Sequence, residues 1–520
     1  MVIQELVSLL LYLGLVVGIG IYFFVRDRKN ATEKDYFLGG RNMGGWVSAL
    51  SAGASDMSAW VLMGLPGAIY LKGVGQLWIA VGLFLGTVLA WIFVAPAIRR
   101  YSIAANDSIT IPQFLNNRFC TEKRGILVVS AVVFMITYCI YAASSIYACG
   151  TLFNTVLGMN PKTAMIIASS VIVLYTFLGG YNAVCWTDFF QGLLMLAALL
   201  AAPICAVLIM NFGNFTAPAT NIPAGYYNMF VSGKIDWKSI SDIISGLGWG
   251  LGYFGMPHIM VRYISIKNEK EMKKSQIIGS FWIFLILLLA CVVGLSGRAY
   301  LGDVLTTTKD GNTLVFINMV RNVCVYIGDF IGATGLMLFL AGMLLSAILA
   351  SAMSTADSQL LASSSAFASD LYKPLIRKNA SDNEMLWAGR AIVLVISVVA
   401  FFIAANPQCK GIMNLVSCAW AAFGSAFGPV VILALYWKRL TYNGAFAGIV
   451  AGFAMNIVWY NLFAAKTGIY EIVPGFVVGF IATYVVSLID KAPSAEVVEL
   501  FNKAKEQTAD VENNKVIETN

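Results

Sequence analysis

Charged residues are scarce in this 520-residue chain, and the groups that most enzymes use for catalysis are scarcer still. Only 12 % of the residues are charged, and His258 is the only histidine. A single histidine excludes a multi-histidine metal site and leaves little room for histidine-based catalysis. The nine cysteines are scattered without a paired CxxC spacing, which favours packing roles. The sequence also has no phosphate-binding loop of the GxxxxGK(S/T) type, which argues against an ATP-driven pump.

Long apolar runs dominate what is present, since 59 % of the residues are hydrophobic. The charge-free runs 125–160, 411–437 and 440–465 each exceed the roughly 20 residues that cross a bilayer. The first run, 6–25, has no small-residue cleavage site, so we interpret it as a retained span and not as a signal peptide. Together the apolar runs predict an all-α integral membrane protein with about 13 spans. The spans are centred near residues 14, 58, 86, 140, 171, 197, 252, 286, 348, 397, 424, 453 and 480, and we expect an outer loop over 301–329.

The basic residues indicate how these spans are oriented. An odd number of spans puts the two termini on opposite faces of the membrane. Most of the 34 Lys and Arg residues then fall on one side, which by the positive-inside rule is the cytoplasm. We therefore expect the N-terminus outside and the C-terminus inside, ending in a short polar tail with a turn or two of helix. The net charge of +7 reflects this topology and needs no nucleic-acid partner.

Two spans are unusually rich in glycine and polar residues, Gly44 to Tyr70 and Ser241 to Tyr263. Their starts are five spans apart, which predicts two inverted five-span repeats, each beginning with a broken helix. The predicted segments are an N-terminal span and cytoplasmic loop, the first repeat, an external loop, the second repeat, two further spans and a cytoplasmic tail, at 1–42, 43–211, 212–238, 239–437, 438–490 and 491–520.

The first glycine-rich span contains a carboxylate, Asp56. A charged side chain at the bilayer centre costs about 2.5 to 3.5 kcal/mol, so such a residue usually faces a functional cavity. Ser51, Ser55 and Ser58 recur at helical spacing beside it, where a cation or a polar substrate could bind. The alternative is a structural carboxylate that pairs with Arg41 or is capped by the neighbouring hydroxyls.

A second polar cluster lies in the third span of the second repeat. Ser351, Ser354, Thr355 and Ser358 form one hydroxylated stripe, and hydroxyl and carbonyl oxygens can replace the hydration shell of a monovalent cation. Small hydroxyl residues also mediate ordinary helix packing in membranes. The position of this span, where it can meet the broken helix of the first repeat, favours the cation site.

Aromatic residues form a third cluster. Trp249 and Tyr253 are four residues apart on the second broken helix and precede Pro257; with Tyr141 they could line a small pocket beside exposed backbone. The alternative is ordinary packing.

Two further carboxylates, Asp188 and Asp357, stand in or beside apolar spans. Each could be an additional cation ligand, or an interfacial or structural carboxylate.

The stretches YFLGGRNMGGWVSALSAGASDMSAWVLMGLPGAIY, GWGLGYFGMPHI, LSAILASAMSTADSQLL and WAAFGSAFGPVV resemble the sodium/solute symporter family, and within it the bacterial members that carry proline. The resemblance extends from about residue 5 to residue 497. It implies a LeuT-like inverted 5+5 core with one additional N-terminal and two additional C-terminal helices, in the cytoplasmic (inner) membrane of a bacterium. It also implies sodium-coupled import of L-proline by alternating access, with Na⁺ and the lipid bilayer as the other partners and no obligatory protein partner.

The resemblance implies roles for individual residues. It assigns a sodium site to the backbone carbonyls of Ala54, Met57 and Ser351 and the hydroxyls of Ser354 and Thr355. It assigns sodium coupling to Asp56, coupling or gating to Arg41 and Ser55, the proline site to Tyr141, Trp249, Tyr253, Pro257, Ser58 and Met256, and a possible second cation site to Asp188, Asp357 and Ser358.

Three positions depart from the pattern of the proline-carrying members. Ala59 stands where glycine is expected, Met256 where glutamine is expected, and Asp357 where a small neutral residue is usual. Met256 bears on substrate selectivity and Asp357 on sodium stoichiometry. Another small carboxylate such as pantothenate or sialic acid is therefore an alternative substrate. A membrane sensor or a channel is an alternative of a different class.

Overall fold

The computed structural model describes residues 2–27, 32–213, 215–218, 220–307 and 310–518. The last residues of the basic segment after the first span, 28–30, lie outside this described part. Helices account for nearly all of the regular structure, and one isolated β-bridge joins Met43 and Ile266. The elements are α1 (Val2–Asp27), α2 (Glu33–Leu38), η1 (Gly39–Arg41), α3 (Gly45–Met57), η2 (Trp60–Gly64), α4 (Leu65–Lys72), η3 (Val74–Gln76), α5 (Leu77–Leu89), η4 (Ala90–Val94), α6 (Ala95–Ala104), α7 (Ile111–Asn117), α8 (Gly125–Leu157), α9 (Pro161–Phe212), α10 (Trp237–Gly248), η5 (Trp249–Phe254), α11 (Pro257–Ser265), α12 (Glu269–Leu301), η6 (Gly311–Leu314), α13 (Val315–Ile331), α14 (Thr334–Ser365), η7 (Ala366–Ile376), α15 (Asp382–Ala404), α16 (Ile412–Tyr436), α17 (Tyr442–Leu462), α18 (Ala464–Thr467), α19 (Ile472–Ile489) and α20 (Ala495–Glu518).

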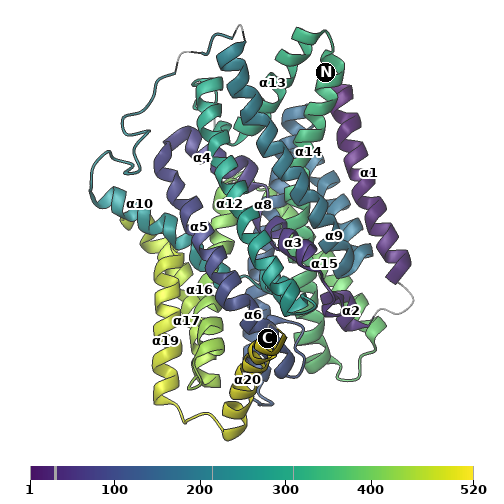
Figure 1. The fold of residues 1–520 in the computed structure, drawn as a ribbon, viewed down its shortest axis with the longest axis vertical. Coiled ribbons are helices and arrows are strands. Elements are labelled where there is room, and N and C mark those ends of the chain that lie inside the picture. The colour runs from purple at the N-terminus through teal and green to yellow at the C-terminus, as the bar shows by residue number, and fades with distance from the viewer. Residues whose placement is uncertain (1, 28–31, 214, 219, 308–309, 519–520) are drawn as a thin grey trace.

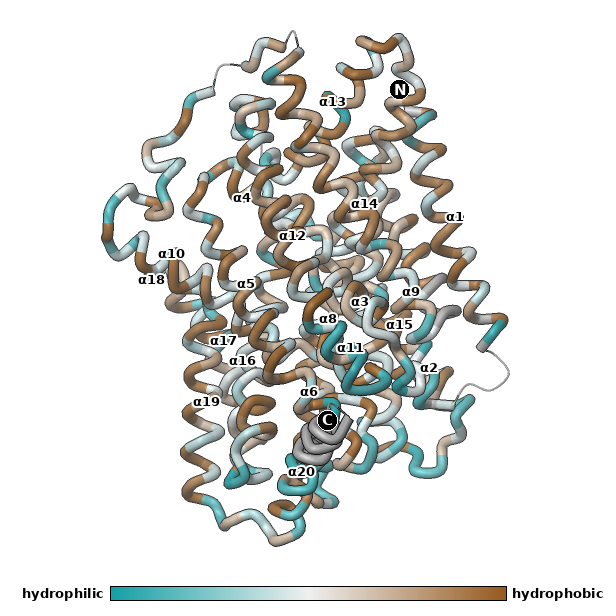
Figure 2. The backbone as a smooth tube through the Cα atoms, viewed as in Figure 1, coloured by the Kyte–Doolittle hydropathy of each residue, from teal (hydrophilic) through white to brown (hydrophobic). Residues whose placement is uncertain are grey.

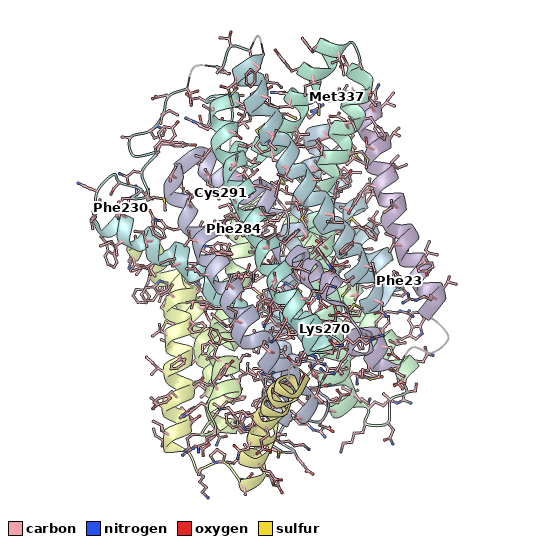
Figure 3. The ribbon with its side chains drawn as sticks, in the orientation of Figure 1. Phe23, Phe230, Lys270, Phe284, Cys291 and Met337 are labelled. Atoms are coloured by element: carbon pink, nitrogen blue, oxygen red, sulfur yellow. The ribbon has the colours of Figure 1, made fainter. Side chains whose placement is uncertain are left out.

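The long helices run between two ends of a bundle, and the two chain termini lie at opposite ends (Figure 1). We call these the N-terminal end and the C-terminal end. Figures 1 and 3, drawn in the same orientation, show the alternation of direction. α12 rises from Lys270 past Phe284 to Cys291, whereas α1 descends from the N-terminus marked in Figure 1 to Phe23. Hydrophilic segments collect at the C-terminal end and in the loop before α10 (Figure 2). This arrangement fits a bundle whose middle lies in lipid.

Apolar side chains also cover the outside of the bundle. Leu10 on α1, Ile204 on α9, Val398 on α15 and Ile481 on α19 are each more than half exposed. A soluble protein rarely exposes so many large apolar residues together, but lipid tails solvate them. Within the described residues, eleven helices are long and apolar enough to cross a membrane.

All but one of these eleven helices coincide with predicted spans. The exception, Gly311–Ile331, lies in a segment that we expected to be an outer loop. There Arg321 of α13 forms an ion pair with Glu5 (2.7 Å), and Tyr326 packs against Phe215, just beyond the end of α9. Because both of these partners lie at the N-terminal end, α13 packs at that end, as Figure 1 shows.

The predicted span near residue 171 is the first half of α9. Gly180 has φ of 61° and ψ of −172° inside this helix. Phe177 packs against Trp387 at the C-terminal end, whereas Gly213, just beyond the helix, lies beside Tyr326 at the N-terminal end. The chain therefore reverses at Gly180, where only glycine adopts a positive φ without steric cost.

The two remaining predicted spans are broken helices. α3 ends at Met57, because Ser58 has φ of 36° and ψ of −175°. In the second, Met256 is extended (φ −79°, ψ 109°) and α11 begins at Pro257. Proline disfavours helical geometry in the residue before it and lacks the N–H that a first helical turn leaves unpaired. Both breaks leave backbone groups without helical partners, as the repeat pattern predicts.

One detail of the sequence prediction was wrong. Ser58 lies beyond the end of α3 and so does not share a helical face with Ser51 and Ser55.

Glycine lets the second broken helix approach its neighbour closely. A Cβ on Gly250 would lie 2.3 Å from the carbonyl oxygen of Gly82, and a Cβ on Gly86 would lie 2.3 Å from that of Gly250. The backbones of α5 and η5 are therefore in direct contact, which larger residues would prevent.

The C-terminal tail differs from the expectation of a turn or two of helix, because α20 spans Ala495–Glu518. Its Phe501 packs edge-on against Tyr101 of α6 (ring centroids 6.1 Å apart), and the buried Arg118 guanidinium carbon lies 5.2 Å from the Phe501 ring. Contacts with distant residues stabilise this helix, and a polar sequence alone does not reveal them.

Candidate functional site

The predicted sodium-site residues meet where α3 ends beside the middle of α14. Ser354 Oγ donates a hydrogen bond to the carbonyl oxygen of Ala54 (2.8 Å) and lies 3.2 Å from that of Ser351. Thr355 is fully buried, and its hydroxyl has no hydrogen-bond partner among the residues that the structure describes. Leaving a buried hydroxyl unpaired costs about 1–3 kcal/mol, unless a ligand uses it.

The end of α3 contributes backbone oxygens to the same place. Met57 is the last residue of α3, so the carbonyls from Ala54 onward lie in the terminal turn, where helical partners are lacking. A helix C-terminus also carries a partial negative charge, which favours a cation. Carbonyl and hydroxyl oxygens without a basic side chain are the ligands that suit a hard monovalent cation.

Asp56 is buried beside this oxygen cluster. Its carboxylate accepts a hydrogen bond from the Tyr253 hydroxyl, so it joins the end of α3 to η5. The alternative of a pair with Arg41 is wrong, because Arg41 Nε instead donates to Asp107 (2.8 Å) at the C-terminal end. Capping by the neighbouring serines is likewise not seen, since Ser55 Oγ donates to the carbonyl oxygen of Ala52 within α3.

The Arg41 side chain is held by several hydrogen bonds away from Asp56. Beyond Asp107, its guanidinium donates to Ser102 Oγ and to the carbonyl oxygens of Ile264 and Ser108, at 2.8–3.0 Å. The side chain thereby ties the loop before α3 to α6 and to the end of α11. This connection lies away from the oxygen cluster, so any effect of Arg41 on coupling acts through these helices.

The aromatic cluster is centred on Trp249. Its ring centroid lies 5.7 Å from that of Trp60, 6.5 Å from that of Trp420 and 5.1 Å from that of Tyr470. Trp420 Nε1 donates to the carbonyl oxygen of Trp249 (2.7 Å), which secures η5 against α16. Trp60, Trp420 and Tyr470 were not predicted; the only signal in the sequence was the position of the first two within the family-like stretches.

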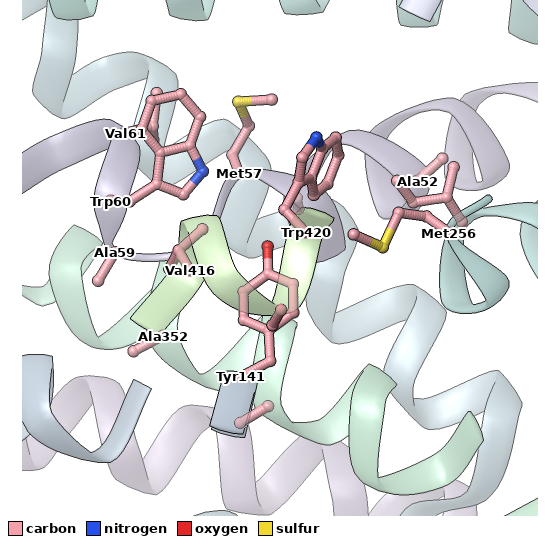
Figure 4. Close-up of a cluster of buried hydrophobic side chains, with 14 of the residues drawn as sticks. Ala52, Met57, Ala59, Trp60, Val61, Tyr141, Met256, Ala352, Val416 and Trp420 are labelled. Atoms are coloured by element: carbon pink, nitrogen blue, oxygen red, sulfur yellow. The ribbon is translucent and has the colours of Figure 1, made fainter. Parts of the chain in front are cut away.

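The other predicted substrate residues surround this cluster unevenly. Tyr141 donates a long hydrogen bond (3.4 Å) to the carbonyl oxygen of Asp56, and in Figure 4 its hydroxyl points between the indoles of Trp60 and Trp420. Met256 is fully buried near them (Figure 4). Ser58 Oγ accepts a hydrogen bond from the backbone N–H of Trp60 (3.3 Å). Pro257 instead lines a small cavity farther toward the C-terminal end.

The predicted second cation site contains a residue that sequence reasoning missed. Asp188 accepts from Ser51 Oγ (2.7 Å) and from Arg262 Nη2 (3.2 Å), and the same nitrogen donates to Ser358. Ser358 in turn donates to Asp357 (3.2 Å). The predicted ligands are therefore together, but a guanidinium lies among them. Arg262 stands within a predicted span, and that unusual placement was the available signal.

Comparisons with known proteins agree with this geometry. The model of the sodium:solute symporter family matches residues 36–452. The high-affinity proline transporter PutP of Bacillus subtilis is 42 % identical over 92 % of this chain and 97 % of its own length. The osmoregulated proline transporter OpuE of the same organism is 41 % identical, covering 96 % and 98 %, and the sodium/proline symporter of Escherichia coli is 40 % identical, covering 94 % of each chain.

Solved structures give the fold independently. The outward-open, substrate-bound structure of a Na⁺-coupled sialic acid symporter superposes with a TM-score of 0.74 at 20 % identity, covering 94 % of this chain and 99 % of that one. The nucleobase-cation-symport-1 transporter Mhp1 superposes with a TM-score of 0.50 at 13 % identity, covering 90 % and 98 %. These likenesses confirm the predicted fold class, an all-helical LeuT-like bundle built around two inverted repeats.

Proposed function

Because the chain belongs to the sodium:solute symporter family, and is thus a multi-pass sodium-coupled transporter and not an enzyme, we propose that its solute is L-proline. Three relatives at 40–42 % identity over nearly the whole chain are named as proline transporters. The aromatic cluster around Trp249 supports this assignment, since its indole faces suit the small apolar ring of proline.

The observation that carries the sodium site is the buried, unpartnered hydroxyl of Thr355 beside the end of α3. We assign the ion to this hydroxyl, to Ser354, and to the carbonyls of Ala54, Met57 and Ser351. Asp56 adds a negative charge that stabilises the bound cation at short range. Asp188, Asp357 and Ser358 would form a second cation site only after Arg262 leaves them.

The two ligands would meet at the break in the first repeat. Backbone N–H groups following Ser58 would receive the proline carboxylate, while carbonyls at the end of α3 hold the ion. Ion and solute then stabilise the same conformation, and each raises the affinity for the other equally. With the N-terminal end outside the bacterial membrane, each net positive charge that enters gains about 2.3 kcal/mol per 100 mV of membrane potential.

Uptake of radiolabelled L-proline into proteoliposomes tests this proposal. We expect uptake to require an inward sodium gradient and to be lost in Thr355→Ala. Ser363→Ala is the matched control, because Ser363 lies on the same helix but donates to carbonyls of that helix, those of Gln359 (2.8 Å) and Leu360 (3.0 Å). Sodium-driven uptake of pantothenate or sialic acid that proline does not inhibit would contradict the proline assignment. Proline uptake that is independent of sodium would contradict the sodium site.

A further inference from the structure

A cavity opens at the C-terminal end of the bundle, where the tail helix α20 packs against α6 (Figure 1). It measures about 310 Å³, within the range of sites that hold small ligands. None of its described lining residues belongs to the proposed ion or solute site. Three helices contribute the lining: α6 through Arg100 and Tyr101, α16 through Leu435 and Tyr436, and α20 through Phe501 and Lys505.

The charge along this lining is positive. No carboxylate stands among the described lining residues, whereas Arg100 and Lys505 do. Arg100 Nη1 lies 3.6 Å from Glu269 Oε2, but Glu269 also lies 3.4 Å from Arg99, so one carboxylate faces two guanidiniums. Lys505 extends over the Phe501 ring (Nζ to centroid 4.8 Å) and forms no ion pair within the described part of the chain. The cavity thus has positive charge that its own residues do not neutralise.

A third positive charge lies behind the wall of the cavity. Arg118, which follows α7, is fully buried, with its guanidinium carbon 5.3 Å from the Tyr101 ring and 5.2 Å from the Phe501 ring. Its Nε donates to the carbonyl oxygen of Ala434 (3.2 Å), but Nη1 and Nη2 have no hydrogen-bond partner among the described residues. A buried charge without a counter-ion is costly, so an anion in the cavity would lower this cost at short range.

An apolar outer surface adjoins the basic lining. Phe93, Ala97 and Arg100 follow one another along one face of η4 and α6, toward the C-terminal end. Phe93 is 51 % exposed, and Tyr436 beside the cavity donates to its carbonyl oxygen (2.6 Å). Tyrosine is enriched where lipid headgroups meet the hydrocarbon. The cavity therefore lies where a lipid-facing surface gives way to charge, which is the level of the headgroups.

We propose that this cavity binds the headgroup of an anionic phospholipid, with Arg100 and Lys505 paired to its phosphate oxygens. Its acyl chains would lie over Phe93, which a free phosphate ion would leave uncovered. The C-terminal end is the predicted cytoplasmic side, so the lipid would come from the inner leaflet. Because Arg100 belongs to α6 and Lys505 to α20, the bound lipid would hold the tail helix on the bundle. The site is independent of the proposed ion and solute.

Native mass spectrometry of the full chain tests this site. The protein is transferred to micelles that contain equal amounts of dioleoyl phosphatidylglycerol and dioleoyl phosphatidylcholine, and the lipid that remains bound is identified by its mass. We expect one phosphatidylglycerol to be retained in preference to phosphatidylcholine. Arg100→Gln/Lys505→Gln should lower this retention by roughly tenfold or more, because each basic residue near the headgroup adds to the affinity.

A matched double variant separates the site from general attraction between charges. Lys267→Gln/Lys503→Gln also removes two positive charges from the C-terminal end, and both lysines are exposed. Lys503 is two residues from Lys505 on α20, about 200° around the helix, so it faces away from the cavity. This variant should retain phosphatidylglycerol as the wild type does. Phosphatidylglycerol should also raise the thermal unfolding midpoint of the wild type and of this control, but not that of Arg100→Gln/Lys505→Gln.

Unchanged retention in Arg100→Gln/Lys505→Gln, or an equal loss in the two double variants, would overturn the proposal, because net charge alone would then explain any binding. Equal retention of both lipids by the wild type would overturn it as well. Displacement of the lipid by added inorganic phosphate would assign the cavity to free phosphate and not to a membrane lipid. Sodium and proline are absent from these measurements, so failure of the proposed transport function appears separately, in uptake.

Discussion

The hydroxyl of Ser354 on α14 donates a 2.8 Å hydrogen bond to the backbone carbonyl of Ala54 on α3. This bond joins the broken helix that opens the first repeat to the third span of the second. The two residues are 300 positions apart, so the proposed sodium site can form only when both repeats are assembled. Any movement of one repeat against the other changes the number of oxygens around the ion, which is how a transporter can couple ion binding to conformation.

The carboxylate of Asp56 should be essential for sodium dependence. Asp56→Asn keeps the shape of the side chain, and the amide oxygen can still accept a hydrogen bond from the Tyr253 hydroxyl. The variant removes the negative charge beside the proposed ion. We expect the sodium concentration for half-maximal proline uptake to rise by about tenfold or more, equal to ~1.4 kcal/mol of lost binding. Tyr253→Phe, which removes only the hydrogen bond, is the companion variant and should have a smaller effect. An unchanged sodium dependence in Asp56→Asn would remove Asp56 from the site.

The aromatic cluster should determine the affinity for the solute. Trp249→Ala removes the indole that contacts Trp60, Trp420 and Tyr470, so we expect a large rise in the KM for proline. Trp420→Phe keeps an aromatic ring but loses its 2.7 Å hydrogen bond to the Trp249 carbonyl, and a rise of about fivefold would match a lost bond of ~1 kcal/mol. Initial rates of uptake over a range of proline concentrations check both. A KM unaffected by Trp249→Ala would place the solute elsewhere.

Arg41 should affect coupling without binding either ligand. Arg41→Lys keeps the charge but cannot reach Asp107, Ser102 and the carbonyls of Ile264 and Ser108 at once. We expect a lower maximal rate of sodium-driven uptake, with proline binding at saturating sodium unchanged. Equilibrium binding of labelled proline, measured beside uptake, checks this separation. Impaired binding at saturating sodium would show that Arg41 acts on the ligand site itself.

Substituting a larger residue for glycine where α5 contacts η5 should destabilise the protein. In Gly250→Ala the new Cβ would lie 2.3 Å from the carbonyl oxygen of Gly82, so the second broken helix must shift. We expect lower thermal stability in detergent and loss of transport. Gly18→Ala on α1 is the control, because a Cβ there has nothing within 4 Å. Wild-type stability in Gly250→Ala would mean that η5 is free to move away from α5.

Much of the fold could be predicted because its signals are local. Runs of apolar residues mark the spans, and glycine, serine and proline mark the breaks at Ser58 and before Pro257, since these residues act on the backbone at their own positions. Distant contacts outweigh composition at two places. α20 is a long helix because Phe501 packs on Tyr101, although a turn or two of helix was expected. Asp56 is partnered by Tyr253 and not by Arg41, which was the structural alternative for this carboxylate.

The candidate site was predictable only in part. Ser354 and Ala54 were placed together by the repeat pattern and the resemblance, and the structure brings them into contact. Trp420 was missed because it stands on α16, which is apolar around most of its circumference, and for such a helix the sequence does not indicate which side faces a neighbour. Tyr470 was missed because it lies in the loop between α18 and α19, where no helical periodicity marks a face. Arg262 was missed although its place within a predicted span was a signal.

The sequence by itself determined that this chain crosses a membrane many times, where its helices break, and which residue types could hold a cation. These properties follow from hydropathy and backbone preferences, which act over a few residues. Only the tertiary structure decided that Tyr253 reaches Asp56 across 197 residues and that Arg262 stands between Asp188 and Ser358. Such pairings depend on how each helix is rotated about its axis, and packing among all of the helices fixes that rotation.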